Sequence, residues 1–412
     1  MSDKVAKATP SSATSTTDVS EAFSSNAVRL SARDWRTAIV VVIVTLVLLP
    51  SAAQRMEPFE PSADYRIPYP YSEDYWLYAR YARHARARYP GVVIGDSVMW
   101  GHYVEPRGTL PHFLNQEAGT DLFANLGLDG TRQVALTGLI KHYGRDISDQ
   151  SVLLHLNPLW LSSPDADLSR PEGAPPDAPP LSRLKGVLLG QAPEDEGISL
   201  NHARLVPQLF SRPYGYRPKF ADVAGISLER RIPYFSWLRH MRIAYYENFG
   251  IQSWSLENPA RNPLEPITLE LRPPDDAPQG APVPWFDGGI EQQDFSWVPL
   301  DKSYQWRFFR DSVDILQRRG NSVFVLLGPI NTHLMTEESA LAYDELKGEM
   351  EAWLEARGIP YYAPPALPSA LYADASHPLQ EGYAQLARQL LQHQSFRDWL
   401  DNAETQNAVP AQ

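Results

Sequence analysis

The sequence predicts an α/β fold built on a parallel sheet, preceded by one membrane-spanning helix. Two observations lead to this expectation. Short apolar runs alternate with longer amphipathic segments over residues 91–160 and again over 304–395, and an uncharged aliphatic stretch lies near the N-terminus. Alternation of this kind indicates right-handed βαβ units, in which helices cover both faces of the sheet. The length of 412 residues allows two or three domains or one elaborated domain.

The composition excludes several classes of protein and site. A hydrophobic content of 43% is ordinary for a globular chain, and the absence of cysteine excludes disulfides, thiolate zinc sites, a cysteine nucleophile and a lipidated cysteine anchor. The 37 Lys and Arg against 49 Asp and Glu give a net charge of −12, which argues against a nucleic-acid partner. The ten histidines form no His-x-x-x-His pair, and no glycine-rich phosphate loop is present, so we expect neither metal nor cofactor.

The N-terminal region divides into a polar tail and an apolar segment. Residues 1–36 are rich in Ser, Thr and Ala, which predicts a disordered tail. The apolar segment, residues 37–53, contains the uncharged run Ala38–Leu49 and follows three arginines, Arg29, Arg33 and Arg36. Basic residues before such a run indicate membrane insertion with the N-terminus in the cytoplasm.

Two interpretations of the apolar segment are open. Ala38–Ala53 has 16 residues, which is slightly short for a span and long for the apolar part of a signal peptide. Ser51 and Ala53 could form a cleavage site, but a 36-residue leader is longer than most secretory leaders. We therefore expect an uncleaved signal anchor at residues 37–53, in a single-pass protein whose remaining chain is periplasmic or extracellular.

The segment at 54–90 is expected to connect the membrane to the folded domain. Residues 54–72 contain four prolines and several aromatic residues, which predict an extended stalk. Residues 73–89 predict a helix, and Pro90-Gly91 ends it.

The domain at 91–412 is expected to contain the parallel sheet. Strands are predicted at 91–94, 121–125, 151–156, 322–327 and 360–362. Helices are predicted at 110–117, 131–145, 304–319, 337–357 and, last in the chain, 379–393; Thr336 is the expected N-cap of the fourth. Residues 163–300 do not continue this alternation. They contain two proline-rich segments and shorter structured pieces such as 232–248, which predict an insertion on one edge of the domain.

Candidate reactive residues follow the predicted strands. In open parallel sheets ligands bind outside the carboxyl ends of the strands. Ser97 follows the first strand, Gly127 the second and Asn157 the third. Asp374 and His377 stand just before the last predicted helix.

These residue types suit catalysis by an acyl-serine intermediate. A serine hydroxyl is a weak nucleophile until a base takes its proton, and the base needs a carboxylate to fix its tautomer. Asp374 and His377, three positions apart, can supply that pair to Ser97. The oxyanion needs donors, which the backbone N–H groups of Ser97 and Gly127 and the side-chain amide of Asn157 could provide. Glycine at 127 would let the backbone approach the substrate.

Four segments resemble conserved blocks of the SGNH (GDSL) hydrolase superfamily: VVIGDSVMWG at 92–101, NLGLDGT at 125–131, HLNPLW at 155–160 and DASHPLQEGY at 374–383. The resemblance implies a flavodoxin-like three-layer α/β/α fold. It also implies that Ser97 is the nucleophile, His377 the base and Asp374 its partner, with Gly127 and Asn157 completing the oxyanion hole. The third block departs from the family, which usually has Gly-x-Asn-Asp where this chain has His-Leu-Asn-Pro. The competing α/β-hydrolase elbow needs glycine two residues after the serine, and Met99 is there instead.

Three functions remain open from the sequence. The first is hydrolysis of an ester, of the O-deacylase or acetylesterase type, on an acylated envelope glycan. The second is O-acyl transfer to a polysaccharide hydroxyl, which would require a membrane-bound acyl donor as partner. The Asp-x-x-His spacing favours the hydrolase, because the acyltransferases that the chain resembles usually carry Asp-x-His-Trp. The third is a non-catalytic envelope protein that uses the fold and its insertion for binding or assembly.

Overall fold

A computed structural model gives the fold of this chain. It describes residues 30–174, 180–189, 198, 200–207, 209, 211–267, 271 and 282–408. The predicted disordered tail, up to residue 29, lies outside the described residues.

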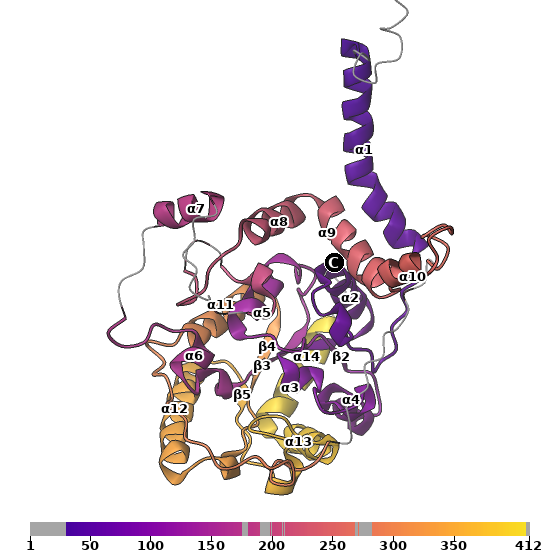
Figure 1. Ribbon diagram of the computed structural model, residues 1–412. Helices are drawn as coiled ribbons and strands as arrows, with labels where there is room; N and C mark the ends of the chain where they lie inside the picture. The colour runs from indigo at the N-terminus through magenta and orange to yellow at the C-terminus, as the bar shows by residue number, and fades with distance from the viewer. Residues whose placement is uncertain are drawn as a thin grey trace, which may run out of the picture.

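Helix α1, Ala32–Met56, contains the predicted membrane anchor (Figure 1). It begins earlier than expected because Ser31 and Asp34 form a capping box, in which each side chain bonds to the backbone of the other. The last residues of the predicted tail are therefore helical. The aliphatic side chains of the run are exposed, Val40 by 58%, and the helix is long and apolar enough to cross a membrane.

The segment after α1 packs against the domain and is not the extended stalk that its prolines predicted. Glu57 is buried directly after the helix, and Ile67 is fully buried. The guanidinium of Arg66 donates to the carbonyl oxygens of Trp100 at 2.8 Å and Gly101 at 2.7 Å. Apolar side chains of this segment are buried against the domain despite its prolines, so no spacer separates α1 from the domain.

The predicted parallel sheet is confirmed, with five strands in the order β2-β1-β3-β4-β5 (Figure 1). The strands are β1 (Gly91–Ile94), β2 (Phe123–Asn125), β3 (Ser151–Leu156), β4 (Ser322–Leu327) and β5 (Tyr361–Tyr362). Neighbouring strands are parallel throughout. The chain winds outward in one direction from β1 and in the other from β3, so the carboxyl ends of these two strands flank the crevice where ligands bind in such sheets.

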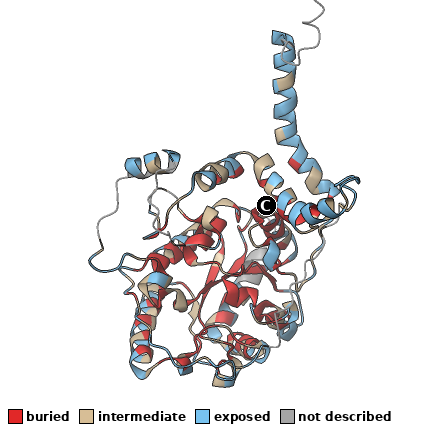
Figure 2. Cartoon of the chain, in the orientation of Figure 1, coloured by how far each residue is buried: buried red, intermediate tan, exposed pale blue. Residues whose placement is uncertain are grey.

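Alternate residues of each strand enter two different cores, as Val92 and Val93 do. The core on one face contains residues of α2 (Tyr75–Arg88), α5 (Gln133–His142), α11 (Tyr304–Arg318) and α12 (Glu337–Ala356). The core on the other face contains residues of α4 (Leu110–Ala118), α13 (Gln380–Gln392) and α14 (Gln394–Ala408). The sheet is thus buried between two helical layers (Figure 2).

Most predicted elements are confirmed to within a few residues, and the strands at 91–94, 151–156 and 322–327 match exactly. Thr336 caps α12 as expected, since its hydroxyl accepts from the N–H of Ser339. The prediction that the helix at 379–393 ends the fold is wrong, because α14 follows it. The rings of Phe396 and Trp399 on α14 lie 5.0 and 5.3 Å from the ring of Phe324, which covers the sheet there.

The insertion forms a set of helices, most of which lie toward the end of the molecule from which α1 projects (Figure 1). They are α6 (Pro164–Asp167), α7 (Pro180–Leu189), α8 (Phe220–Arg231), α9 (Pro233–His240), the π-helix η6 (Met241–Glu247) and α10 (Ile251–Glu257). Helix α9 packs against α1 and α2, so this part of the insertion lies outside a helical layer and not beside an edge strand. The predicted piece at 232–248 is α9 with η6. Half of the proline-rich segment at 171–180 and most of the one at 272–284 lie outside the described residues.

Candidate active site

Ser97 stands at the carboxyl end of β1, as the first residue of the short helix α3 (Ser97–Trp100). The buried Asp96 caps this helix, because its Oδ1 accepts the N–H of Val98 at 3.0 Å. Gly95 makes the tight turn possible, since a Cβ there would lie 2.5 Å from Met99 Cγ and 2.8 Å from His155 Cβ. The Gly-Asp-Ser sequence therefore positions the serine by packing and capping.

The structure brings Ser97, His377 and Asp374 together. His377 Nε2 lies 2.8 Å from Ser97 Oγ, although the two residues are 280 positions apart in the chain. His377 Nδ1 lies 2.8 and 2.9 Å from the two carboxylate oxygens of Asp374. Because a carboxylate only accepts, Nδ1 carries the imidazole proton and Nε2 is left to accept the serine O–H. This is the arrangement of a nucleophile, a base and an orienting carboxylate.

Backbone groups hold the Asp374 carboxylate in its ionised form. Its Oδ1 accepts the N–H groups of Ser376 and His377, each at 2.9 Å. Burial would raise the pKa of Asp374, but His377 and these N–H donors lower it to about 2. Burial likewise opposes the charged form of His377, yet Asp374 in contact with it and Asp96 nearby raise the pKa of His377 above its usual value.

The pH dependence of kcat/KM should follow the raised pKa of His377. The base acts in its neutral form, so kcat/KM should fall as the pH drops through a midpoint above about 6.5, the ordinary pKa of histidine. The substitution Asp374→Asn removes the carboxylate that raises this pKa, and we expect the midpoint to move to lower pH while the rate falls. A pH profile of ester hydrolysis for both proteins tests this; an unchanged midpoint in the variant would contradict it.

Asn157 lies at the end of β3 with its side-chain amide directed at the buried Asp96. Asn157 Nδ2 donates to Asp96 Oδ2 at 2.9 Å, and its second, longer contact is with Ser376 Oγ at 3.3 Å. Trp160 Nε1 also donates to Asp96 Oδ2, at 2.8 Å. The first hydrogen bond anchors the amide, and the second is long enough for an oxyanion to compete with it. The role of Asn157 in an oxyanion hole remains a prediction.

Gly127 lies beside α3, and its N–H already has an acceptor. It donates to Asn125 Oδ1 at 3.0 Å, while Asn125 Nδ2 donates to the carbonyl oxygen of Met99 at 2.9 Å. A Cβ on Gly127 would lie 2.7 Å from the backbone nitrogen of Trp100. In this geometry the glycine allows close packing of two loops. Its N–H could donate to an oxyanion only after breaking the hydrogen bond to Asn125 Oδ1. The N–H of Ser97 has no acceptor among the residues that the structure describes.

A second histidine and carboxylate pair, not predicted from the sequence, lies beside the first. His102 Nδ1 is 3.0 and 3.1 Å from the two carboxylate oxygens of Asp129, and the His102 and His377 rings are 5.6 Å apart. Nδ1 therefore carries the proton here too, and Nε2 of His102 has no partner within the described part of the chain. Tyr103 packs edge-on against His377 at 5.4 Å. The signal was the position of His102 and Asp129, just after Ser97 and Gly127.

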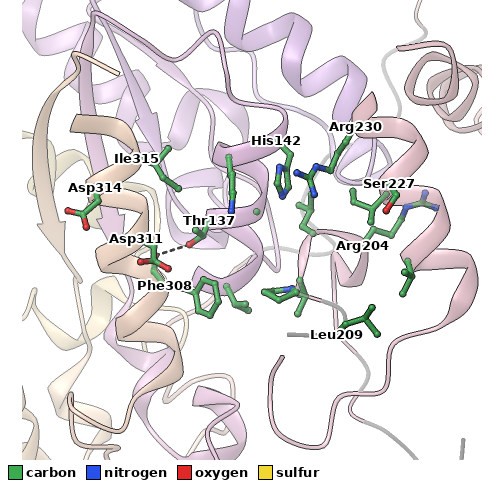
Figure 3. Close-up of a pocket in the computed structure, with 18 of the residues that line it drawn as sticks. Thr137, His142, Arg204, Leu209, Ser227, Arg230, Phe308, Asp311, Asp314 and Ile315 are labelled. Carbon is green, nitrogen blue, oxygen red and sulfur yellow. Dashed lines mark hydrogen bonds between the residues drawn. The ribbon is translucent and has the colours of Figure 1, made fainter. Parts of the chain in front are cut away.

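A large cavity lies away from these residues. It has a volume of about 690 Å³ and lies between α5, α8 and α11, with His142, Arg204 and Arg230 on one side and Asp311 and Asp314 on the other (Figure 3). None of Ser97, Asp374 and His377 lines it. The candidate active site is thus the Ser97 region at the sheet edge and not this cavity.

Comparisons with other proteins do not assign a family to this chain. No protein-family model matches the chain, and no curated protein matches it either. No group of three His, Asp or Glu side chains placed to hold a metal occurs among the described residues. The expectation that the chemistry uses neither metal nor cofactor stays a prediction.

Proposed function

We propose that this chain is a serine-dependent ester hydrolase of the SGNH type. The observation that carries the proposal is the chain of contacts from Ser97 Oγ to His377 Nε2 at 2.8 Å, and from His377 Nδ1 to Asp374 at 2.8 Å. Its place at the carboxyl ends of the strands, beside β1 and β3, agrees with the site expected for a doubly wound sheet. The flavodoxin-like strand order supports the same superfamily.

The reaction uses the residues in a fixed order. His377 takes the proton of Ser97 as Oγ attacks the ester carbonyl, and Asp374 stabilises the imidazolium that forms. The N–H of Ser97 faces the oxyanion, and the Asn157 amide joins it by giving up its long contact with Ser376. His377 then passes its proton to the leaving alkoxide, the alcohol departs, and an acyl group remains on Ser97 Oγ. Water, deprotonated as it attacks, releases the acid and restores the serine.

The proposed location is outside a membrane crossed once by α1. The arginines that precede α1 favour a cytoplasmic N-terminus, which places the domain in the periplasmic or extracellular space. An acylated envelope glycan is the substrate class that suits this location. The same acyl-serine could pass its acyl group to a sugar hydroxyl, and the Asp-x-x-His spacing is the feature that favours water as acceptor.

The direct test is to detect the acyl-serine. The full chain in detergent is mixed with an activated acetate ester, quenched in acid and analysed by peptide mass spectrometry. We expect one acetyl group on the peptide that contains Ser97, formed as fast as the first turnover. Acetylation of other residues alone would reject the mechanism. Adding acetylated and free oligosaccharides then separates hydrolysis from transfer, because only transfer yields a newly acetylated sugar.

The pair His102 and Asp129 is proposed to activate the water that resolves the acyl-serine. The His102 ring lies 5.6 Å from the His377 ring, and the His102 side chain is 43% exposed, so water reaches it. We expect His102→Gln to leave the first burst within a few-fold while steady turnover falls about 100-fold, the usual contribution of a general base. Stopped-flow measurement of both phases tests this. Equal losses in the two phases, or none, would contradict it.

A further inference from the structure

The helices of the insertion lie at the end of the molecule from which α1 projects. Helices α8, α9 and α10 all occupy this end in Figure 1, and α9 packs directly against α1. The domain begins at once after α1, because Glu57 is buried against Arg80, His240 and Tyr245. With no spacer, a bilayer crossed by α1 must come close to these helices.

The level at which α9 meets α1 can be read from burial along α1. Pro50 is the one buried residue of α1, and it directly follows the apolar run that ends at Leu49. The stretch Ala38–Ala53 is about 24 Å long as a helix, whereas the hydrocarbon core of a bilayer is about 30 Å thick. Helix α9 therefore meets α1 near the end of the membrane-spanning stretch, at the level of the bilayer boundary.

The surface of these helices is unusually apolar for one that faces water. Leu238 on α9 is 47% exposed, Leu228 on α8 is 42% exposed and Leu256 on α10 is 77% exposed. An open groove of about 520 Å³ lies between α8, α9 and η6. Its apolar lining consists of Leu228, Phe235, Leu238, Met241 and Tyr246, and Arg204, Arg239 and Arg242 also line it. Exposed apolar area of this kind marks a contact surface.

The charge of this region is opposite to that of the chain. Residues 211–261 contain eight Lys and Arg against four Asp and Glu, although the whole chain has 37 against 49. Arg231 at the end of α8 is exposed. Tyr234 and Trp237 on α9 are half-buried, and residues of this type concentrate at the boundary between lipid and water. Helices α8 and α9 thus carry apolar, aromatic and basic side chains that are exposed or half-buried.

We propose that α8, α9 and α10 form a membrane-docking surface that binds anionic phospholipid at the boundary of the bilayer crossed by α1. The inference depends on α1 spanning that bilayer and is independent of the reaction at Ser97. Leu228, Leu238 and Leu256 enter the headgroup region, the groove accepts part of an acyl chain, and the excess of arginine faces the lipid phosphates. The surface compensates for a short anchor and fixes the orientation of the domain on the membrane.

Spin labels on single cysteines test this in the full chain, which contains no cysteine of its own. Spin labels are attached to the cysteines of the variants Leu238→Cys and Leu256→Cys. The variant Val42→Cys, within α1, is the membrane reference. Leu341→Cys is the water reference, because Leu341 is 63% exposed and its helix α12 lies at the other end of the molecule from α1 in Figure 1. In bilayers of phosphatidylcholine and phosphatidylglycerol, we expect labels at 238 and 256 to collide with oxygen more than with a nickel chelate, as at 42.

Each outcome decides the proposal. If the labels at 238 and 256 are in water, as the label at 341 is, while the label at 42 is in lipid, the docking surface is rejected and the membrane anchor is retained. If the label at 42 is in water, both the membrane anchor and the docking surface are rejected. Equal depths at 238 in phosphatidylcholine alone and with phosphatidylglycerol would overturn the preference for anionic lipid. Circular dichroism of the same labelled proteins shows that they are folded, so the labels report on docking even if the wild type does not hydrolyse an ester.

Discussion

Ser97→Ala is expected to abolish ester hydrolysis by the full chain, down to the level of the buffer. The substitution removes the only atom that accepts the acyl group, whereas Asp96 still caps α3, so the fold should persist. His377→Ala should lower kcat by at least about 10⁴-fold, because no other base lies at hydrogen-bond distance from Ser97 Oγ among the described residues. Steady-state hydrolysis of an activated acetate ester measures both.

The double variant provides the sharper control. Groups that act as a unit give strongly non-additive losses, so Ser97→Ala combined with His377→Ala should be no slower than Ser97→Ala alone. Ser253→Ala on α10, an exposed serine far along the chain from the site, should hydrolyse the ester as the wild type does. Equal rates for Ser97→Ala and the wild type would reject the catalytic proposal and favour a binding or assembly role.

Asp96→Ala is expected to destabilise the protein and also to inactivate it. The fully buried carboxylate accepts from the Val98 N–H, the Asn157 amide and the Trp160 indole N–H. Its loss leaves the buried donors of Val98 and Asn157 and the half-buried donor of Trp160 without their acceptor. An unpaired buried donor costs about 1–3 kcal/mol and a half-buried one less, so we expect the free energy of unfolding to fall by about 3–5 kcal/mol. Chemical denaturation followed by near-ultraviolet circular dichroism measures the change.

A matched substitution separates this effect from the loss of any aspartate. Asp301 is exposed, and Asp301→Ala should change the free energy of unfolding by less than about 0.5 kcal/mol. Asp96→Asn retains one carbonyl oxygen and should fall between the wild type and Asp96→Ala. A normal stability in Asp96→Ala would mean that the donors around it find other partners, and that Asp96 is not the centre of this loop cluster.

Part of the site could be predicted because its signals are local. Gly-Asp-Ser after a strand and Asp-x-x-His before a helix are short segments. Such segments come together at the carboxyl ends of the strands of a parallel sheet. The partners of those residues could not be predicted in the same way. Whether the Gly127 N–H is free depends on the rotamer of Asn125, and the amide of Asn157 is directed by Asp96.

The stalk and the last helix show how packing overrides a local pattern. Four prolines between residues 54 and 72 indicated an extended connection, but the side chains of Ile67 and Arg66 are buried against the domain. The helix at 379–393 was expected to complete the fold, yet Phe324 on the sheet still needed the cover that α14 provides. In both segments, burial of apolar surface decided the outcome, and that depends on residues far away in the chain.

The sequence by itself determined the parallel α/β fold, the apolar helix near the N-terminus, and Ser97, Asp374 and His377 as candidates. It could do so because strand and helix periodicity, and turns at strand ends, are properties of neighbouring residues. Only the tertiary structure decided the strand order, the meeting of His102 with Asp129 beside His377, and the packing of α9 against α1. These contacts join residues between 27 and 275 positions apart, since His102 and His377 are at positions 102 and 377, and their energy exists only once the sheet and its two helical layers have assembled.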